Sequence, residues 1–254
     1  MTEEATVLTD EADGVLVITI NRPEAKNAVN LSVAQGVAAA LERLDSDDSL
    51  RVGVLTGAGG TFCAGMDLKA FVTGEFPQIE GRGFGGMTER SADKPLIAAV
   101  AGHAVAGGLG VALYCDVRIA DETAVFGVFC RRFGVPMSDG TTVRLPRLIG
   151  ESRAMDMMLS GRAVEAQEAY RIGLVSEVVP IGQALERAQA FALDLSRFPQ
   201  LALRSDRRAI LEGRGLTLDA ALRQEAAFAE EAKQKEAAAG AQRFADGVGR
   251  HGAR

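Results

Sequence analysis

The segment AGHAVAGGLG, residues 101–110, constrains the fold of this chain more than any other stretch. It lies between an apolar run at residues 96–100 and a helix-compatible run at residues 111–116. Small residues let a ligand approach main-chain N–H groups that side chains would otherwise screen. We therefore predict a strand-to-helix turn whose amides bind an anion or a developing oxyanion, although close packing of the backbone would also require glycines.

Strand and helix signals alternate in the preceding part of the chain. Residues 15–21, VLVITIN, are β-branched with period two, and residues 52–56 form a short apolar run, so both predict strands. Between them, Ser32 and Gln35 have the spacing of a capping box and predict a helix over residues 33–44. The alternation predicts a layered α/β domain.

Toward the C-terminus the helical pattern continues without a further strand signal. Helices are predicted over residues 184–198, 201–213 and 218–239, which are rich in Ala and Glu. We therefore divide the chain into a core domain, residues 1–198, and a helical segment, residues 199–254. The helical segment is expected to pack on the core or to mediate self-association.

The composition is that of an ordinary globular protein, with 254 residues, 47% hydrophobic content and a net charge of −6. This acidic balance lacks the basic footprint of a nucleic-acid-binding protein. Three cysteines without paired spacing indicate reduced thiols, and with only two histidines they argue against a metal site. The acidic N-terminus is unlike a signal peptide, and glycines interrupt the apolar residues 95–114, so we expect a cytoplasmic protein without a membrane span.

A second glycine cluster, Gly81, Gly83 and Gly86, has the formal spacing G-x-G-x-x-G. It follows no apolar strand and opens no clear helix, which is the context that a dinucleotide site requires. We therefore predict a mobile surface loop over a cleft at this position.

Several motifs in sequence order resemble the enoyl-CoA hydratase/isomerase family, the crotonase superfamily. They are ITINRPEAKNAVN, FCAGMDL, AGHAVAGGLGVALYCDVRIA, RLPRLIG and LSGRAVEAQEAYRIGLVSEVVP. The resemblance spans about residues 15–180 and implies an α/β fold, a spiral of ββα units followed by C-terminal helices. It also implies an acyl-CoA thioester substrate, no separate cofactor, and assembly as a homotrimer or a dimer of trimers.

The resemblance assigns a role to two glycine-rich stretches, residues 57–66 (GAGGTFCAGM) and residues 101–110. By position, the main-chain amides of Met66 and Gly107 would donate to the thioester carbonyl and stabilise an enolate, as fixed donors in an oxyanion hole do. The alternative is that both loops are merely tight. The resemblance further implies substrate contacts from Arg22, Lys26, Ala64, Met66, Asp67, Leu68, Lys69, Gly107 and Cys130.

These substrate contacts have structural alternatives. Lys69, Arg22 and Lys26 are expected to meet the CoA phosphates, or else to be solvated surface cations. Asp67 suits the capping of a loop, and His103 is expected to be a buried spacer.

The sequence departs from the family at the usual acid/base positions. Where standard hydratases have two glutamates, motif alignment places Gly110 and Cys130. The nearest replacement is Asp139, which could carry a proton, attack as a nucleophile, or cap the helix predicted over residues 141–148. Enoyl-CoA hydration or isomerisation, thioester hydrolysis or dehalogenation, and non-catalytic acyl-CoA binding therefore all stay open. Four aromatic residues border the acyl pocket or belong to the core: Phe71, Phe84, Phe129 and Phe133.

Overall fold

The structure is a computed structural model and describes residues 5–247. The chain forms two compact units, one ending at Ser196 and one beginning at Arg197. Residues 1–4 and 248–254, which belong to the predicted acidic N-terminus and the predicted helical segment, lie outside the described residues. No helix in the described part of the chain is long and apolar enough to cross a membrane.

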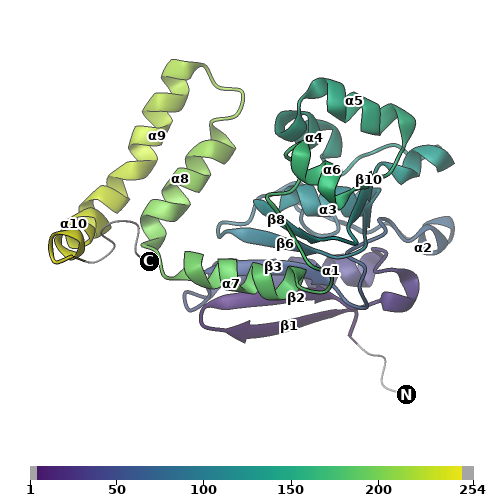
Figure 1. Ribbon diagram of the computed structural model, residues 1–254, viewed down its shortest axis with the longest axis horizontal. Helices are drawn as coiled ribbons and strands as arrows, with labels where there is room; N and C mark the ends of the chain where they lie inside the picture. Colours follow the sequence, from purple (N-terminus) through teal and green to yellow (C-terminus); the bar gives the residue numbers. More distant parts are fainter. Residues whose placement is uncertain (1–4, 248–254) are drawn as a thin grey trace. The chain divides into compact units, whose positions relative to one another are not determined.

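The first unit is organised around a six-stranded sheet with the order β1-β2-β3-β6-β8-β11. Its strands are β1 (Val7–Ala12), β2 (Val15–Ile20), β3 (Val52–Gly57), β6 (Leu96–Val100), β8 (Val117–Asp121) and β11 (Glu177–Val179). The pairs from β2 to β11 are parallel, as the predicted alternation of strands and helices requires. The additional strand β1 pairs antiparallel with β2 through the turn at Asp13 and Gly14, and forms the edge of the sheet (Figure 1).

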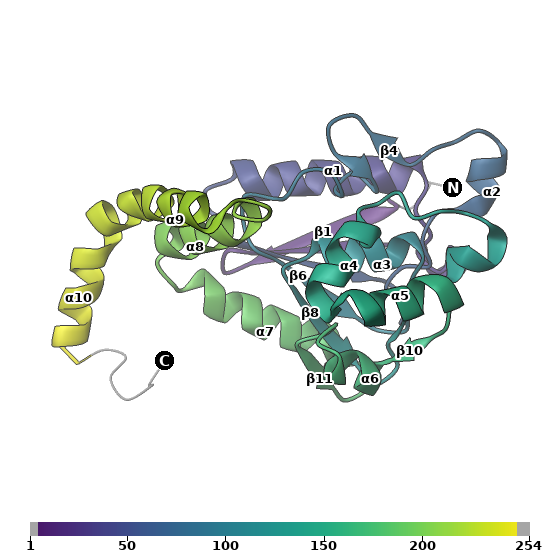
Figure 2. The same cartoon turned by 90° about the horizontal axis from the view of Figure 1, so that it is seen from above.

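Helices cover both faces of this sheet. Leu16, Ile18 and Ile20 of β2 join the core on the side of α1 (Leu31–Ser46), whereas the alternate residues of the strand pack on the side of α7 (Ala184–Ser196). Figure 2 shows α1 and α7 on opposite sides of the strands. The predicted layered α/β architecture is confirmed.

The start of α1 differs from the prediction. Asn30 is the N-cap, and its side chain accepts a hydrogen bond from the amide of Val33 at 3.0 Å. Ser32 lies inside the helix, and its hydroxyl contacts that of Thr6 at 2.8 Å. The predicted capping box is therefore wrong, because the helix begins two residues earlier than a Ser32 cap requires, with Asn30 capping the amide of Val33.

A three-stranded sheet with the order β10-β9-β7 lies beside the point where α3 begins. Its strands are β7 (His103–Val105), β9 (Val125–Gly127) and β10 (Val164–Glu165), and α3 spans Gly107–Tyr114. Residues 101–110 therefore form a short strand before the helix, in place of a simple turn. The imidazole of His103 is exposed, so the prediction of a buried spacer is wrong.

The second glycine cluster forms a small hairpin of β4 (Gln78–Ile79) and β5 (Gly83–Phe84). The β5 strand is buried, with Phe84 in the hydrophobic core. The prediction of a surface loop is therefore wrong for β5, because its aromatic side chain packs into the unit.

Short helices connect the strands of the first unit: η1 (Pro23–Ala25), α2 (Leu68–Val72), η2 (Phe129–Phe133), α4 (Thr141–Ile149), α5 (Glu151–Ser160) and α6 (Ala166–Arg171). The second unit contains α8 (Gln200–Glu212), α9 (Leu218–Ala232), the π-helical turn η3 (Lys233–Ala237) and α10 (Ala238–Ala245). Within that unit α8 packs against α9, and Glu236 accepts hydrogen bonds from the first amides of α8.

Candidate active site

Two main-chain segments from distant parts of the chain form one wall of a cavity in the first unit. We call it the amide wall; it comprises residues 63–66 and 105–107. Cys63 pairs with β7, because its amide donates to the carbonyl of His103 at 2.8 Å and its carbonyl accepts from Val105 at 3.1 Å. Gly65 packs so closely on α3 that a β-carbon there would lie 2.8 Å from the amide nitrogen of Gly107.

The amides of Met66 and Gly107 are the available donors of the amide wall. Neither donates a hydrogen bond within residues 5–247, and both residues line the cavity. Gly107 is the first residue of α3, where amides have no acceptor in their own helix. Ala106 before it has φ 51° and ψ −127°, a conformation that is costly for a residue with a β-carbon. Such strain is typical of functional sites.

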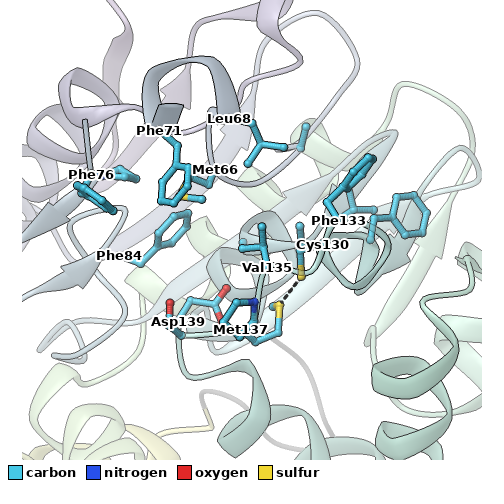
Figure 3. A pocket seen from close by; sticks show the side chains of 18 of the residues that line it. Met66, Leu68, Phe71, Phe76, Phe84, Cys130, Phe133, Val135, Met137 and Asp139 are labelled. Atoms are coloured by element: carbon cyan, nitrogen blue, oxygen red, sulfur yellow. Dashed lines mark hydrogen bonds between the residues drawn. The ribbon is translucent and has the colours of Figure 1, made fainter. Parts of the chain in front are cut away.

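The opposite side of the cavity is built from side chains. We call it the carboxylate wall; it comprises residues 129–139. Asp139 lies in the loop before α4 and carries the only carboxyl group among the described residues that line the cavity. Figure 3 shows Asp139 and Met137 across the cavity from Met66 and Phe71.

The Asp139 carboxyl group is nearly enclosed, with 4% of the residue exposed. Its Oδ1 accepts a hydrogen bond from the amide of Thr141 at 3.0 Å. The N-cap of α4 is Gly140, so Asp139 supports the start of the helix without being its N-cap. Burial raises the pKa of the Asp139 carboxyl above its ordinary value, although hydrogen bonds from Thr141 and the charge of Arg144 act in the opposite direction.

Cys130 lies on the carboxylate wall with its Sγ 3.1 Å from the sulfur of Met137, the contact drawn in Figure 3. Burial raises the pKa of the Cys130 thiol, and the charge of Asp139 raises it further. The group is therefore a neutral thiol at pH 7, which is a poor base and a poor nucleophile. Its place is in the lining of the cavity.

The cavity has a volume of about 470 Å³ and is mainly apolar. The predicted residues Ala64, Met66, Leu68, Gly107, Cys130 and Asp139 line it, as do the aromatic residues Phe71, Phe84, Phe129 and Phe133. Residues that the sequence did not indicate also line it: Phe76, Pro77, Gln78, Val105, Ala106, Val135, Pro136, Met137 and Ser138. No Lys, Arg or His side chain is among the described residues that line it.

The four remaining predicted contacts lie outside this lining. Arg22 forms an ion pair with Asp67 at 2.9 Å and donates to the carbonyl of Ala28 at 2.7 Å. Asp67 is the N-cap of α2. Burial acts to raise the pKa of its carboxyl group, but the hydrogen bond from the Ala70 amide and the Arg22 guanidinium outweigh it and hold this pKa below its ordinary value. Lys26 and Lys69 are exposed.

The sequence matches the family described as enoyl-CoA hydratase/isomerase over residues 10–248. The chain belongs to this family. It is 38% identical over 216 residues to enoyl-CoA hydratase EchA19 of Mycobacterium tuberculosis, a match that covers 81% of this chain and 80% of that protein. It is 37% identical over 219 residues to 2,3-dehydroadipyl-CoA hydratase of Escherichia coli, covering 83% and 84%.

The fold is shared with solved members of the family. The crystal structure of enoyl-CoA hydratase EchA1 from Mycobacterium marinum matches with a TM-score of 0.93, at 43% identity over 96% of each chain. The predicted crotonase fold with a C-terminal helical segment is therefore confirmed. As a member of the enoyl-CoA hydratase/isomerase family, the chain is an enzyme that acts on acyl-CoA thioesters.

Proposed function

We propose that the amides of Met66 and Gly107 bind the thioester oxygen of an enoyl-CoA and that Asp139 carries the proton in the reaction. The proposal rests on one observation: Asp139 supplies the only carboxyl group in the described lining of a cavity that also holds both available amides. Main-chain donors at fixed positions stabilise negative charge on a thioester oxygen without reorganisation.

One carboxylate is sufficient for a shift of the double bond. Asp139 accepts a proton from one carbon of the acyl group, the electron pair moves toward the thioester oxygen, and the carboxyl group returns the proton to another carbon. Hydration requires the same carboxylate to activate water and also to deliver a proton to the α-carbon. We therefore expect isomerisation to be the faster of the two reactions.

The test compares wild type with Asp139→Asn, using 2-enoyl-CoA and 3-enoyl-CoA thioesters in heavy water. The variant keeps an oxygen acceptor for the Thr141 amide. We expect kcat to fall about 10²- to 10⁴-fold with KM and the circular dichroism spectrum nearly unchanged. A shift of the double bond without gain of water indicates isomerisation, and gain of water indicates hydration.

Other outcomes of this test identify the alternatives. Unchanged turnover in Asp139→Asn would remove Asp139 from the mechanism. An acyl or aryl ester on Asp139, seen as a mass increase, would assign it as a nucleophile in hydrolysis or dehalogenation. Tight binding of CoA thioesters without turnover in wild type would indicate a non-catalytic binder.

We also propose that the CoA phosphates meet Lys26 and Lys69, because both cations are exposed, Lys26 at the end of η1, where its carbonyl accepts from Ala64 of the amide wall, and Lys69 in α2, just after that wall. Arg22 and Asp67 would contribute by fixing the start of α2, where they pair. Leu68, Ala64 and the remaining lining would contact the rest of the substrate. No separate cofactor is needed for proton transfer beside an oxyanion hole.

The assembly is proposed to be a homotrimer or a dimer of trimers in the cytoplasm, with residues 199–254 mediating self-association. Support comes from large apolar side chains that are exposed in the second unit, including Ile210, Leu218, Leu222 and Phe244. Light scattering on the purified full chain measures the number of subunits.

A further inference from the structure

Position 110 lies in the interior of α3, where glycine is less favourable than alanine. Gly110 is buried, and helices α3 and α4 pack against one another. A buried helical glycine at such a contact indicates that something occupies the space of its missing side chain.

That space is filled by the carboxyl group of Asp139. A β-carbon built at position 110 would overlap Cγ and Oδ2 of Asp139 and would lie 2.9 Å from Oδ1. The carboxyl group has little room to retreat, because its side chain is short and Oδ1 is held by the amide of Thr141. Aspartate at 139 therefore requires glycine at 110.

Gly108, two residues earlier, is constrained in a different way. A β-carbon there would overlap the carbonyl of Cys63, which belongs to the main chain of the amide wall. Glycine is thus required at position 108 by the main chain of Cys63. At position 110 it is required by a single side chain, Asp139, which takes part in the proposed reaction.

We propose that Gly110 is a positioning residue: because it has no side chain, the Asp139 carboxylate can lie against α3. The acid/base group then comes from the loop before α4, and not from α3 itself. This inference rests on the proposed function of Asp139. It predicts that a carboxylate is accommodated from position 110 or from position 139, but not from both. The glutamate missing from α3 is on this view replaced in space by Asp139.

The first experiment measures thermal unfolding midpoints for Gly110→Ala in two backgrounds. Beside Asp139, we expect the substitution to lower the midpoint because the new methyl group overlaps the carboxyl group. Beside Asp139→Ala, which removes the Cγ and both carboxyl oxygens that the new methyl group would overlap, we expect it to raise the midpoint because alanine favours the helix. Gly240→Ala in α10, where the nearest atom lies 4.0 Å away, is the matched control and should raise the midpoint in both backgrounds.

The second experiment measures kcat and KM for a short apolar enoyl-CoA. Gly110→Ala should lower kcat at least about tenfold with KM nearly unchanged, because the carboxylate is displaced from the reacting carbons. Asp139→Ala should lose most activity. The double variant Gly110→Glu/Asp139→Ala should exceed Asp139→Ala at least about tenfold in kcat, since it returns a carboxylate to the same region from α3.

Two results would overturn the inference: an equal fall of the midpoint in both backgrounds, or a folded double variant that binds the thioester but regains no turnover. Full activity of Asp139→Ala would instead refute the proposed role of Asp139 in the reaction. In that case the signs of the midpoint shifts would still decide whether Gly110 makes room for this side chain, so the two failures are distinguishable.

Discussion

The amide wall and the carboxylate wall face the same cavity but are built in opposite ways. The amide wall is main chain, held by hydrogen bonds between residue 63 and β7, with no space for a β-carbon at Gly108. The carboxylate wall presents side chains from η2 and the following loop. A β-carbon added at Gly134 in this wall would have no other atom within 4 Å. From this difference we infer that the amide wall binds the thioester. The side chains of the carboxylate wall, which can change without moving the main chain, determine which proton is transferred and which acyl groups are accepted.

The largest effect on kcat is expected from Gly108→Ala, which disrupts the amide wall. The added methyl group overlaps the carbonyl of Cys63 and forces residues 63–66 away from α3. Since the amides of Met66 and Gly107 then no longer converge, we expect kcat to fall about 10²- to 10³-fold. Overpacking should lower the free energy of unfolding by about 1–3 kcal/mol, measured by urea denaturation.

Gly134→Ala on the carboxylate wall is the matched control. Its φ of 71° makes alanine costly by about 1–2 kcal/mol, but a methyl group there meets no neighbour. We therefore expect a comparable loss of stability with kcat nearly unchanged. Equal losses of kcat in the two variants would show that the walls do not differ in the way described.

A second prediction concerns charge on the substrate. The described lining of the cavity has Asp139 but no cationic side chain, so a carboxylate at the end of the acyl group would be buried without a partner. We expect kcat/KM for 2,3-dehydroadipyl-CoA to be at least about 30-fold lower than for 2-hexenoyl-CoA, because leaving such a group unpaired costs 2 kcal/mol or more. The two acyl chains have equal length, so the comparison isolates the charge.

Equal kcat/KM values for these two substrates would show that the end of the acyl group lies outside the apolar cavity. The comparison also separates this chain from one of its relatives, which is named for 2,3-dehydroadipyl-CoA.

The two walls also differ in how far the sequence predicts them. The sequence indicated Met66 and Gly107 through their positions in the motifs of the family that it resembles, and the small residues around them allow main chains to approach closely. It also indicated Asp139 as a carboxylate, but left its role open between chemistry and a helix cap. The structure shows that one oxygen supports α4 while the carboxyl group lines the cavity, which no local pattern states.

Elements that form only through contacts with residues distant in the sequence were the hardest to predict. Strand β1 has mostly exposed side chains, and only Val7 packs against the core, so its pairing with β2 is what identifies it. Phe84 lies in a glycine-rich stretch that looks like a loop, yet it packs against α3 so closely that a β-carbon at Gly107 would lie 2.6 Å from its ring. By contrast, β2, β3 and β6 were predicted because period and β-branching are local properties.

The smallest expected effect is on the pH dependence of stability, and it distinguishes two carboxylates: Asp139, and Asp67, the residue that follows the amide wall. Burial raises the pKa of Asp139 in the folded protein above its ordinary value of 3.8, so its stabilising contribution is complete at lower pH and is lost as pH rises through the folded pKa. Replacing it with asparagine should therefore increase stability relative to wild type by an amount that grows as pH rises above the ordinary pKa and levels off above the folded pKa. Each unit by which the pKa is raised corresponds to about 1.4 kcal/mol.

Asp67→Asn should behave in the opposite way. Its folded pKa is lowered, so its contribution is present at neutral pH and is lost as pH falls through the folded pKa. The variant should be less stable than wild type by about 1 kcal/mol at pH 7, because it loses the ion pair with Arg22 while asparagine still caps α2, and it should approach wild type in acid. Urea denaturation of the three proteins between pH 3 and pH 8 gives both differences. The same sign in both variants would mean that Asp139 is a stabilising cap like Asp67, whereas opposite signs would mean that the enzyme keeps Asp139 at a cost in stability, as expected of a group retained for its chemistry.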